Sequence, residues 1–137
     1  MIIQGTTTSF KRQILLGEQD LLNDTLKMAL YTALATLNKD TTEYTSSNEI
    51  SGTGYTAGGL QLSNVTVTAS DGVVYVSFDN PTWDPGAFTA RGALIYNSSK
   101  NNASIAVLNF GYDITSQNTF TVPLPPNTAS SALIRIT

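Results

Sequence analysis

The stretch AFTARGALIYNSSKNNASIAVLNF, residues 87–110, decides the fold class, because it holds two β-strand patterns separated by a polar turn. In residues 87–96, every second residue from Phe88 to Tyr96 is apolar or small, which is typical of a strand with one buried face. Residues 97–102 are polar turn formers. Residues 104–110 are largely apolar on both parities, so we expect this strand to be central and covered on both faces.

The flanking sequence carries further strand patterns, which lie at residues 25–32, 60–68, 73–78, 120–124 and 132–136. Asp71-Gly72 predicts a tight hairpin, and residues 113–118 predict a turn. Ser63-Asn64 interrupts one pattern and predicts a bulge. About seven or eight short strands between Gly, Pro and Asn turns predict an all-β protein. We expect a β-sandwich, with a jelly roll as one form of it.

One short N-terminal helix is expected within residues 8–22. Phe10 and Ile14 begin an apolar stripe at helical spacing. Ser9 is the expected N-cap and Gly17 the expected stop. Because about two turns are not stable alone, the helix must pack against another part of the protein.

The segment between residues 33 and 59 has no strand pattern and is predicted to be a structured surface excursion. Residues 50–59 contain four glycines, and a loop this long in a compact domain tends to be functional. A short helical turn over residues 41–46 is one interpretation of its middle. Residues 1–8 also lack a pattern, so we predict an N-terminal arm over 1–8 and a single β-sandwich domain over 9–137.

The composition excludes much of enzyme chemistry. The chain has neither His nor Cys, which removes disulfides, thiolate metal sites and the commonest general base. Only 12% of residues are charged and the net charge is −3, which argues against nucleic acid as a partner. The 20 Thr, 13 Ser and 11 Asn supply polar surface instead. No apolar run is long enough to predict a membrane span.

Carboxylates are the remaining candidates for acid–base or metal chemistry. Asp79 and Asp84 flank Trp83, and a glycosidase needs two carboxyl groups across a cleft. Both aspartates also begin turns, which is the interpretation we prefer. Asp20 and Asp24 do not form the close oxygen cluster that calcium requires. We therefore expect no catalytic residue, no cofactor site and no metal site.

Three other features have a structural and a functional interpretation. The glycine-rich residues 52–59 lack the Lys and the following helix of a phosphate loop, so they predict a close backbone approach instead. Trp83 and nearby aromatic residues predict either a core cluster, which we prefer, or a sugar-stacking platform. Arg91 lies inside an apolar strand and predicts either an ion pair or a partner contact. Four Asn-x-Ser/Thr sequons are expected from this composition and do not indicate glycosylation; they begin at Asn23, Asn64, Asn97 and Asn102.

Four segments together resemble a family of structural proteins from tailed bacteriophages, including phages of cyanobacteria. They are SFKRQILLG (9–17), DTLKMALYTALATLNKDTTEYTSSNEISGTGYTAGG (24–59), FTARGALIYNSSK (88–100) and SALIRI (131–136). The similarity spans residues 9–136, and some members resemble capsid decoration, or cement, proteins. The resemblance brings no catalytic residues with it.

This resemblance implies a non-enzymatic virion protein on the capsid surface, with the major capsid protein as its partner. We expect the contacts in the arm, the glycine-rich loop and one strand, at Ile2, Ile3, Gly54, Tyr55 and Arg91. A neck, tail or fibre-base component is the alternative, and a carbohydrate-binding module is a further one. The sequence leaves open whether the protein is a monomer or a homo-oligomer.

Overall fold

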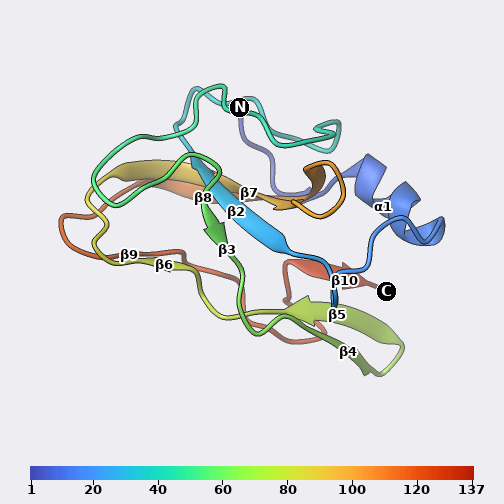
Figure 1. The fold of residues 1–137 in the computed structure, drawn as a ribbon. Helices are drawn as coiled ribbons and strands as arrows, with labels where there is room; N and C mark the ends of the chain where they lie inside the picture. Colours follow the sequence, from blue (N-terminus) through green and yellow to red (C-terminus); the bar gives the residue numbers. More distant parts are fainter.

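The computed structural model describes residues 1–137 and confirms the all-β, sandwich-like prediction (Figure 1). Its largest sheet is antiparallel, with the strand order β1 (Gly5–Thr6), β8 (Ala103–Thr115), β7 (Thr89–Asn97), β2 (Leu26–Tyr31) and β3 (Leu60–Gln61). A second sheet has the order β10 (Ile134–Ile136), β5 (Val73–Ser77) and β4 (Thr66–Ser70). The two remaining strands, β6 (Thr82–Trp83) and β9 (Phe120–Thr121), pair with each other. The one helix is α1 (Thr8–Leu15).

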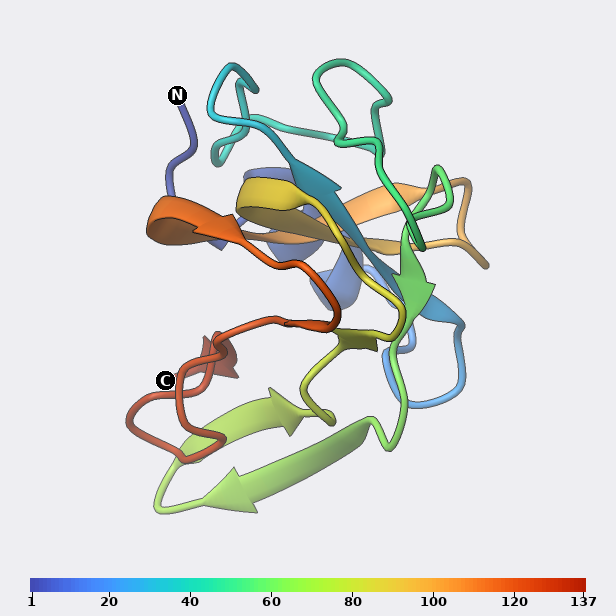
Figure 2. The same ribbon diagram turned by 90° about the vertical axis from the view of Figure 1, so that its left-hand side faces the viewer.

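The large sheet is the middle layer of the molecule (Figure 2). Below it lies the three-stranded sheet, and a main core of 20 buried residues fills the space between them. Above it runs the excursion 33–59, which covers the opposite face through a second core of eight buried residues. Both faces are therefore covered along most of β7 and along residues 103–108 of β8, whereas Asn109 is exposed although it belongs to the stretch predicted to be covered.

The β7–β8 hairpin departs from simple alternation at a bulge. Ala90 pairs with Ile114, but Gly92 pairs with Asn109, so the register shifts around Arg91. As a consequence Ala90 faces the main core, whereas Leu94 faces the second core. The alternate residues from Phe88 to Tyr96 are all buried, but the bulge moves the later ones to the other face of the sheet, so they do not share one face as their spacing predicts.

The turn predicted at residues 113–118 begins later than expected. Strand β8 continues to Thr115 and pairs again with β7 after the bulge. Side chains support this end of the ladder, since the Thr89 and Thr115 hydroxyls lie 2.7 Å apart. Nε of Arg91 donates to Asp113 Oδ1 at 3.0 Å.

Other predicted elements are shorter than expected. Helix α1 ends at Leu15, and its N-cap is Thr7 rather than Ser9, because the Thr7 hydroxyl accepts a hydrogen bond from Phe10 N. Gly17 follows with a φ of 70°, as the predicted helix stop requires. The excursion contains no helical turn at residues 41–46.

The pattern over residues 60–68 is not one strand with a bulge. It divides at Asn64, which has a φ of 54°, into β3 of the large sheet and β4 of the three-stranded sheet. The hairpin prediction at Asp71-Gly72 is confirmed, with φ angles of 51° and 80°. No helix of the structure is long and apolar enough to cross a membrane.

The N-terminal arm predicted over residues 1–8 is part of the domain. Gly5 and Thr6 form β1, which pairs with β8. Ile3 N donates to Leu37 O at 2.8 Å, and Ile2 is only 6% exposed. The apolar side chain of Ile2 fills the second core, which is why the segment does not extend freely.

Candidate functional site

The carboxylate of Glu49, in the excursion, accepts three hydrogen bonds. Its Oε1 accepts from the Tyr44 hydroxyl at 2.5 Å, and its Oε2 accepts from the Tyr55 hydroxyl at 2.5 Å. The backbone N–H of Gly58 also donates to Oε2, at 2.8 Å. Charged acceptors make the stronger hydrogen bonds of proteins, so Glu49 holds three parts of the excursion together.

Two further tyrosines fasten the excursion to the large sheet. The Tyr31 hydroxyl on β2 donates to Thr45 O, and the Tyr96 hydroxyl on β7 donates to Gly58 O, both at 2.6 Å. Tyr96 also stacks on Tyr44, with ring centroids 4.9 Å apart. We call Glu49 and these four tyrosines, including Tyr55, the Glu49–tyrosine cluster.

The chemistry of the Glu49–tyrosine cluster is that of a structural clamp. Burial raises the pKa of all four tyrosine hydroxyls above the usual value of a phenol, and the Glu49 carboxylate raises it further. The phenols therefore stay protonated and act as donors. No buried side-chain polar atom in the protein lacks a hydrogen-bond partner. This arrangement holds a long loop in one conformation.

The glycine-rich loop approaches the backbone of other segments closely at two glycines, as its sequence predicts. A Cβ on Gly54 would lie 1.8 Å from Pro85 O, and a Cβ on Gly59 would lie 1.8 Å from Met28 O. Both glycines have positive φ, of 87° and 84°. Gly54, predicted as a partner contact, thus packs against the protein's own backbone.

The five predicted contact residues do not form one patch. Ile2 is buried, so its side chain is not available to a partner, whereas Ile3 is 52% exposed. Tyr55 is half-buried and belongs to the clamp, and Arg91 is paired with Asp113. The arm leads into β1 and the glycine-rich loop leads into β3, and these strands are opposite edges of the large sheet.

The aromatic residue proposed for sugar stacking lies in the main core. Trp83 is 4% exposed and packs against Tyr55, Phe88 and Phe120, with centroids 6.0 to 6.2 Å away. The platform interpretation is therefore wrong and the core interpretation is confirmed. A stacking platform needs an exposed ring face, and this ring has none to offer.

The acidic candidates all lie in turns. Asp79 accepts from the side-chain amide of Asn64 at 2.5 Å, and both Asp79 and Asp84 are exposed. Neither aspartate lines any of the three surface cavities. Asp20 accepts from the backbone N–H groups of Leu22 and Asn23, as a turn aspartate does.

A second turn aspartate anchors buried amides instead of a metal. Asp24 Oδ2 accepts from Asn97 Nδ2 at 2.8 Å, and Asn97 also donates to Gln19 at 3.1 Å. Asn97 is fully buried, so this sequon offers no accessible acceptor nitrogen. No group of three or more acidic residues is placed to hold a metal ion.

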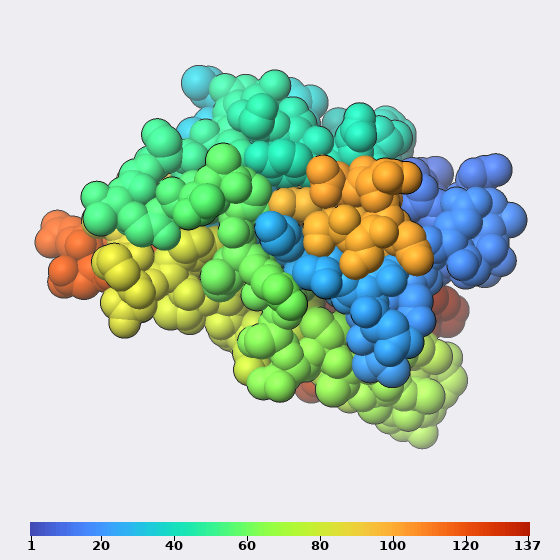
Figure 3. All heavy atoms as spheres, viewed as in Figure 1, coloured from blue at the N-terminus to red at the C-terminus, as the bar shows by residue number.

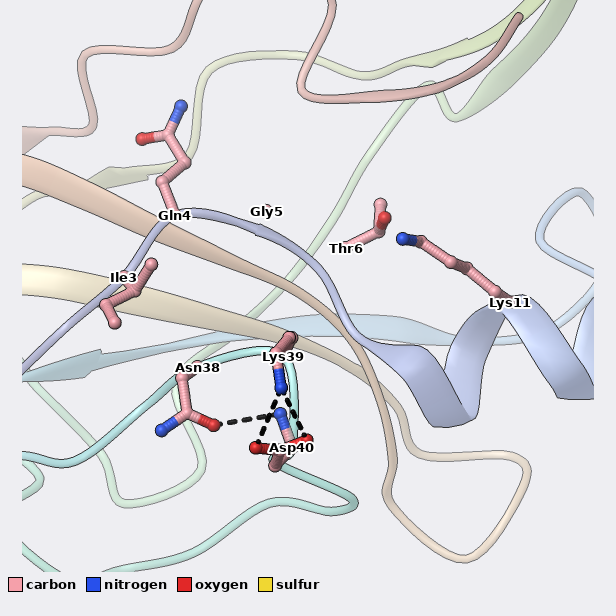
Figure 4. Close-up of a pocket in the computed structure, with 8 residues that line it drawn as sticks. All are labelled: Ile3, Gln4, Gly5, Thr6, Lys11, Asn38, Lys39 and Asp40. Atoms are coloured by element: carbon pink, nitrogen blue, oxygen red, sulfur yellow. Dashed lines mark hydrogen bonds and ion pairs between the residues drawn. The ribbon is translucent and has the colours of Figure 1, made fainter.

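A polar groove of about 530 Å³ lies between the N-terminal segment and residues 38–40 (Figure 4). Lys39 Nζ is 3.2 Å from both carboxylate oxygens of Asp40, and Asp40 N donates to Asn38 Oδ1. Lys11 reaches toward the groove from α1. The groove is thus polar and partly self-neutralised.

A second, apolar groove of about 190 Å³ lies between α1 and the three-stranded sheet. The residues that line it are Phe10, Ile14, Leu21, Val67, Val74, Val76, Ile134, Arg135 and Ile136. The strand register of the three-stranded sheet places apolar residues side by side at the bottom of this groove: Val76 of β5 is opposite Val67 of β4 and Ile134 of β10. One whole face of this sheet is therefore apolar, and we call it the groove face.

The large sheet covers only the base of the groove face. Val76 and Ile134 are buried, but Val67, Val74 and Ile136 are 46%, 40% and 53% exposed. In Figure 3 the β4–β5 hairpin projects at the lower right, beyond the body of the molecule. A neighbouring depression of about 430 Å³ continues along α1 to Leu15, which is 87% exposed.

Sequence reasoning missed this exposed apolar surface. The alternation in residues 66–77 indicates an apolar face, but it does not say how much of that face another layer covers. Leu15 follows Ile14 at the end of α1, and its side chain faces solvent. Comparison with known proteins adds no relative: no protein-family model, curated protein or solved structure matches the chain.

Proposed function

We propose that this protein is a non-enzymatic structural component of a tailed-bacteriophage virion, and that it decorates the capsid. In this proposal it binds major capsid subunits through the apolar groove between α1 and the three-stranded sheet. The observation that carries the proposal is the exposed apolar surface at this groove. Contiguous apolar surface of this kind marks interaction sites on proteins. The resemblance of four sequence segments to phage structural proteins supplies the virion as the setting.

The chemistry of the groove defines the segment that would bind it. All of its lining residues except Arg135 are apolar, and Arg135 is exposed at its edge. A capsid segment with two or three apolar anchors and one acidic residue beside Arg135 complements this surface. The low charge of the whole chain, at −3, permits many copies to sit close together on one particle.

The scaffold suits such a role. The main core and the second core together cover both faces of the large sheet without a disulfide. The Glu49–tyrosine cluster fixes the long excursion, so little of the surface is left to order on binding. A preorganised surface loses less conformational entropy when it binds.

The test is binding of purified protein to phage particles that lack it. Val74→Glu places a charge in the groove, whereas Val73→Glu places the same charge on the opposite face of β5 and is the matched control. We expect Val74→Glu to abolish binding and Val73→Glu to retain it. Equal binding by both variants would refute the groove as the contact.

The number of copies per particle separates decoration from other virion positions. Quantitative mass spectrometry of purified particles should find hundreds of copies for a decoration protein. A dozen copies or fewer would instead assign the protein to the neck, the tail or a fibre base, and its absence from particles would refute the proposal.

A further inference from the structure

Strand β4 forms an unpaired edge of the three-stranded sheet. It contains the five residues Thr66–Ser70, TVTAS, and its only neighbour is β5. The strand has no charged residue, no proline and no register shift against β5. Proteins ordinarily protect a free edge with one of these features, because an unprotected edge is a template for pairing with another strand.

The hairpin turn determines which backbone groups face the free edge. Asp71 and Gly72 both have positive φ, which defines a two-residue turn closed by the hydrogen-bonded pair Ser70 and Val73. Because such pairs alternate along an antiparallel ladder, Thr66 and Thr68 also bond to β5. The N–H and C=O groups of Val67 and Ala69 therefore point away from the sheet. No hydrogen bond outside the ladders uses them.

The other sheet edges are shorter or protected. Strands β1 and β3 have two residues each, and β10 has three residues with Arg135 at its centre. The distal half of β8 is interrupted at Gly111, which has a φ of 85°, and carries Asp113. Among the edges of this protein, β4 is the one best suited to accept a strand.

We propose that β4 pairs antiparallel with β4 of a second copy of this chain, across a two-fold axis at Thr68. In this register Val67 lies opposite Ala69 of the second copy, and Thr68 lies opposite its own equivalent. The outward groups of Val67 and Ala69 then form four backbone hydrogen bonds between the copies. The surface is self-complementary, as an isologous dimer contact requires.

The side chains agree with this register on both faces. Val67 and Ala69 are on the groove face, so the pairing brings apolar residues of the two copies together. Because the strands are antiparallel, the uncovered tip of each hairpin lies beside the covered base of the other. On the outer face, Thr66, Thr68 and Ser70 are uncharged, and Thr–Thr cross-strand pairs are favourable. This inference concerns a second copy and stands independently of the proposed capsid partner.

Cysteine cross-linking tests the register directly, because the natural chain has no cysteine. Thr68 and its equivalent form a non-hydrogen-bonded pair, with Cα atoms about 4.5 Å apart. That separation lies within the range that a disulfide spans. We expect Thr68→Cys to form a disulfide-linked dimer under mild oxidation. Ser77→Cys, on the same face but one strand further in, should stay monomeric on non-reducing gels.

Charge substitutions test the same contact without a covalent bond. We expect Thr68→Lys and Thr68→Glu each to weaken dimerisation by about fivefold or more, because like charges then lie opposite each other. An equimolar mixture of the two variants should restore the dimer as a heterodimer. Ser77→Lys is the matched control and should dimerise as the natural chain does. Circular dichroism of each variant shows whether it is folded.

Sedimentation velocity over a range of concentrations gives the oligomeric state. A concentration-dependent dimer of the natural chain, weakened at Thr68 and restored in the mixture, supports the proposal. A natural chain that stays monomeric up to about millimolar concentration, the limit of weak affinity, overturns it. So does a dimer that Thr68→Lys leaves unchanged, or equal cross-linking of Thr68→Cys and Ser77→Cys.

Discussion

Removal of the Glu49 carboxylate should loosen the excursion more than any other single change to a polar residue of that segment. In Glu49→Ala, the Tyr44 and Tyr55 hydroxyls and the Gly58 N–H lose a charged acceptor. Hydrogen bonds to charged groups contribute about 1.5–3 kcal/mol each when buried, and this site is half-buried. Taking about 1 kcal/mol for each bond, we expect the free energy of unfolding to fall by about 3 kcal/mol.

The conservative variant and a control define the cause. Glu49→Gln keeps one carbonyl acceptor and should lose about half as much, roughly 1.5 kcal/mol. Glu43→Gln is the control, because Glu43 lies in the same segment but its side chain is exposed and makes no hydrogen bond. Loss of its negative charge should change the free energy of unfolding by less than about 0.5 kcal/mol.

Urea denaturation followed by two probes measures the effect. Far-ultraviolet circular dichroism reports the sheets, and the fluorescence of Trp83 reports the excursion, because Tyr55 packs on its ring at 6.0 Å. If the excursion comes loose before the sheets unfold, the fluorescence transition of Glu49→Ala should occur at a lower urea concentration than the circular dichroism transition. The reasoning is refuted if Glu49→Ala unfolds within about 0.5 kcal/mol of the natural chain, the range of surface substitutions, or if Glu43→Gln loses as much.

Three further predictions follow from the geometry. Gly59→Ala should lower the free energy of unfolding by about 3 kcal/mol or more, because the new Cβ would lie 1.8 Å from Met28 O. Gly17→Ala is the control: Gly17 also has a positive φ, but a Cβ there would meet nothing within 4 Å, so this variant should lose only about 1–2 kcal/mol in urea denaturation. Ile2→Ala should lower stability by about 2 kcal/mol in the same assay, since Ile2 fills the second core; a change near zero would mean that the N-terminal segment is not docked. Alkali should destabilise the fold, because buried phenols such as Tyr31 keep their protons in the folded state at a pH where the unfolded chain loses them. The free energy of unfolding should therefore be unchanged below about pH 10 and should fall above it by up to about 1.4 kcal/mol per pH unit for each such tyrosine. Denaturation midpoints that stay constant from pH 9 to pH 11.5 would contradict the last prediction.

Local patterns in the sequence predict the hairpins of this fold well. The Asp71-Gly72 turn and the strands around it depend on backbone preferences that act within a few residues. The same holds for β7 and β8, whose turn contains Asn101 and Asn102 in left-handed conformations. Each of these features is encoded where it occurs.

Features that depend on distant segments were not predictable. The bulge at Arg91 has no signal in the strand pattern, and the Gly92 that follows it is closely packed: a Cβ there would lie 2.7 Å from Leu108 O and 2.9 Å from Ile2. The second core includes Ala35 and Leu37, but Leu34 in the same short apolar run is 78% exposed, so the run alone does not indicate which of its residues are covered. The same limit applies to the exposed groove face, because alternation predicts an apolar face but not the layer that covers it.

The contact residues illustrate this limit for function. Ile2 and Tyr55 are predicted as partner contacts because they are apolar or aromatic residues in segments without a strand pattern. Ile2 is buried in the second core, and Tyr55 is half-buried against the main core. The surface that remains exposed comes instead from Val67, Val74 and Leu15, which sit in regular elements and look like core residues.

The two apolar faces of the large sheet have a consequence for how the protein withstands damage. Ala29, Tyr31, Leu94 and Tyr96 lie under the excursion, on the upper face of β2 and β7. A single proteolytic cut within residues 33–48, none of which belongs to the main core, would free this face to meet the same face on other molecules. Wide apolar sheet surfaces associate readily. We therefore expect nicked protein to aggregate while it retains most of its secondary structure, so that an intact excursion is what keeps the protein from aggregating.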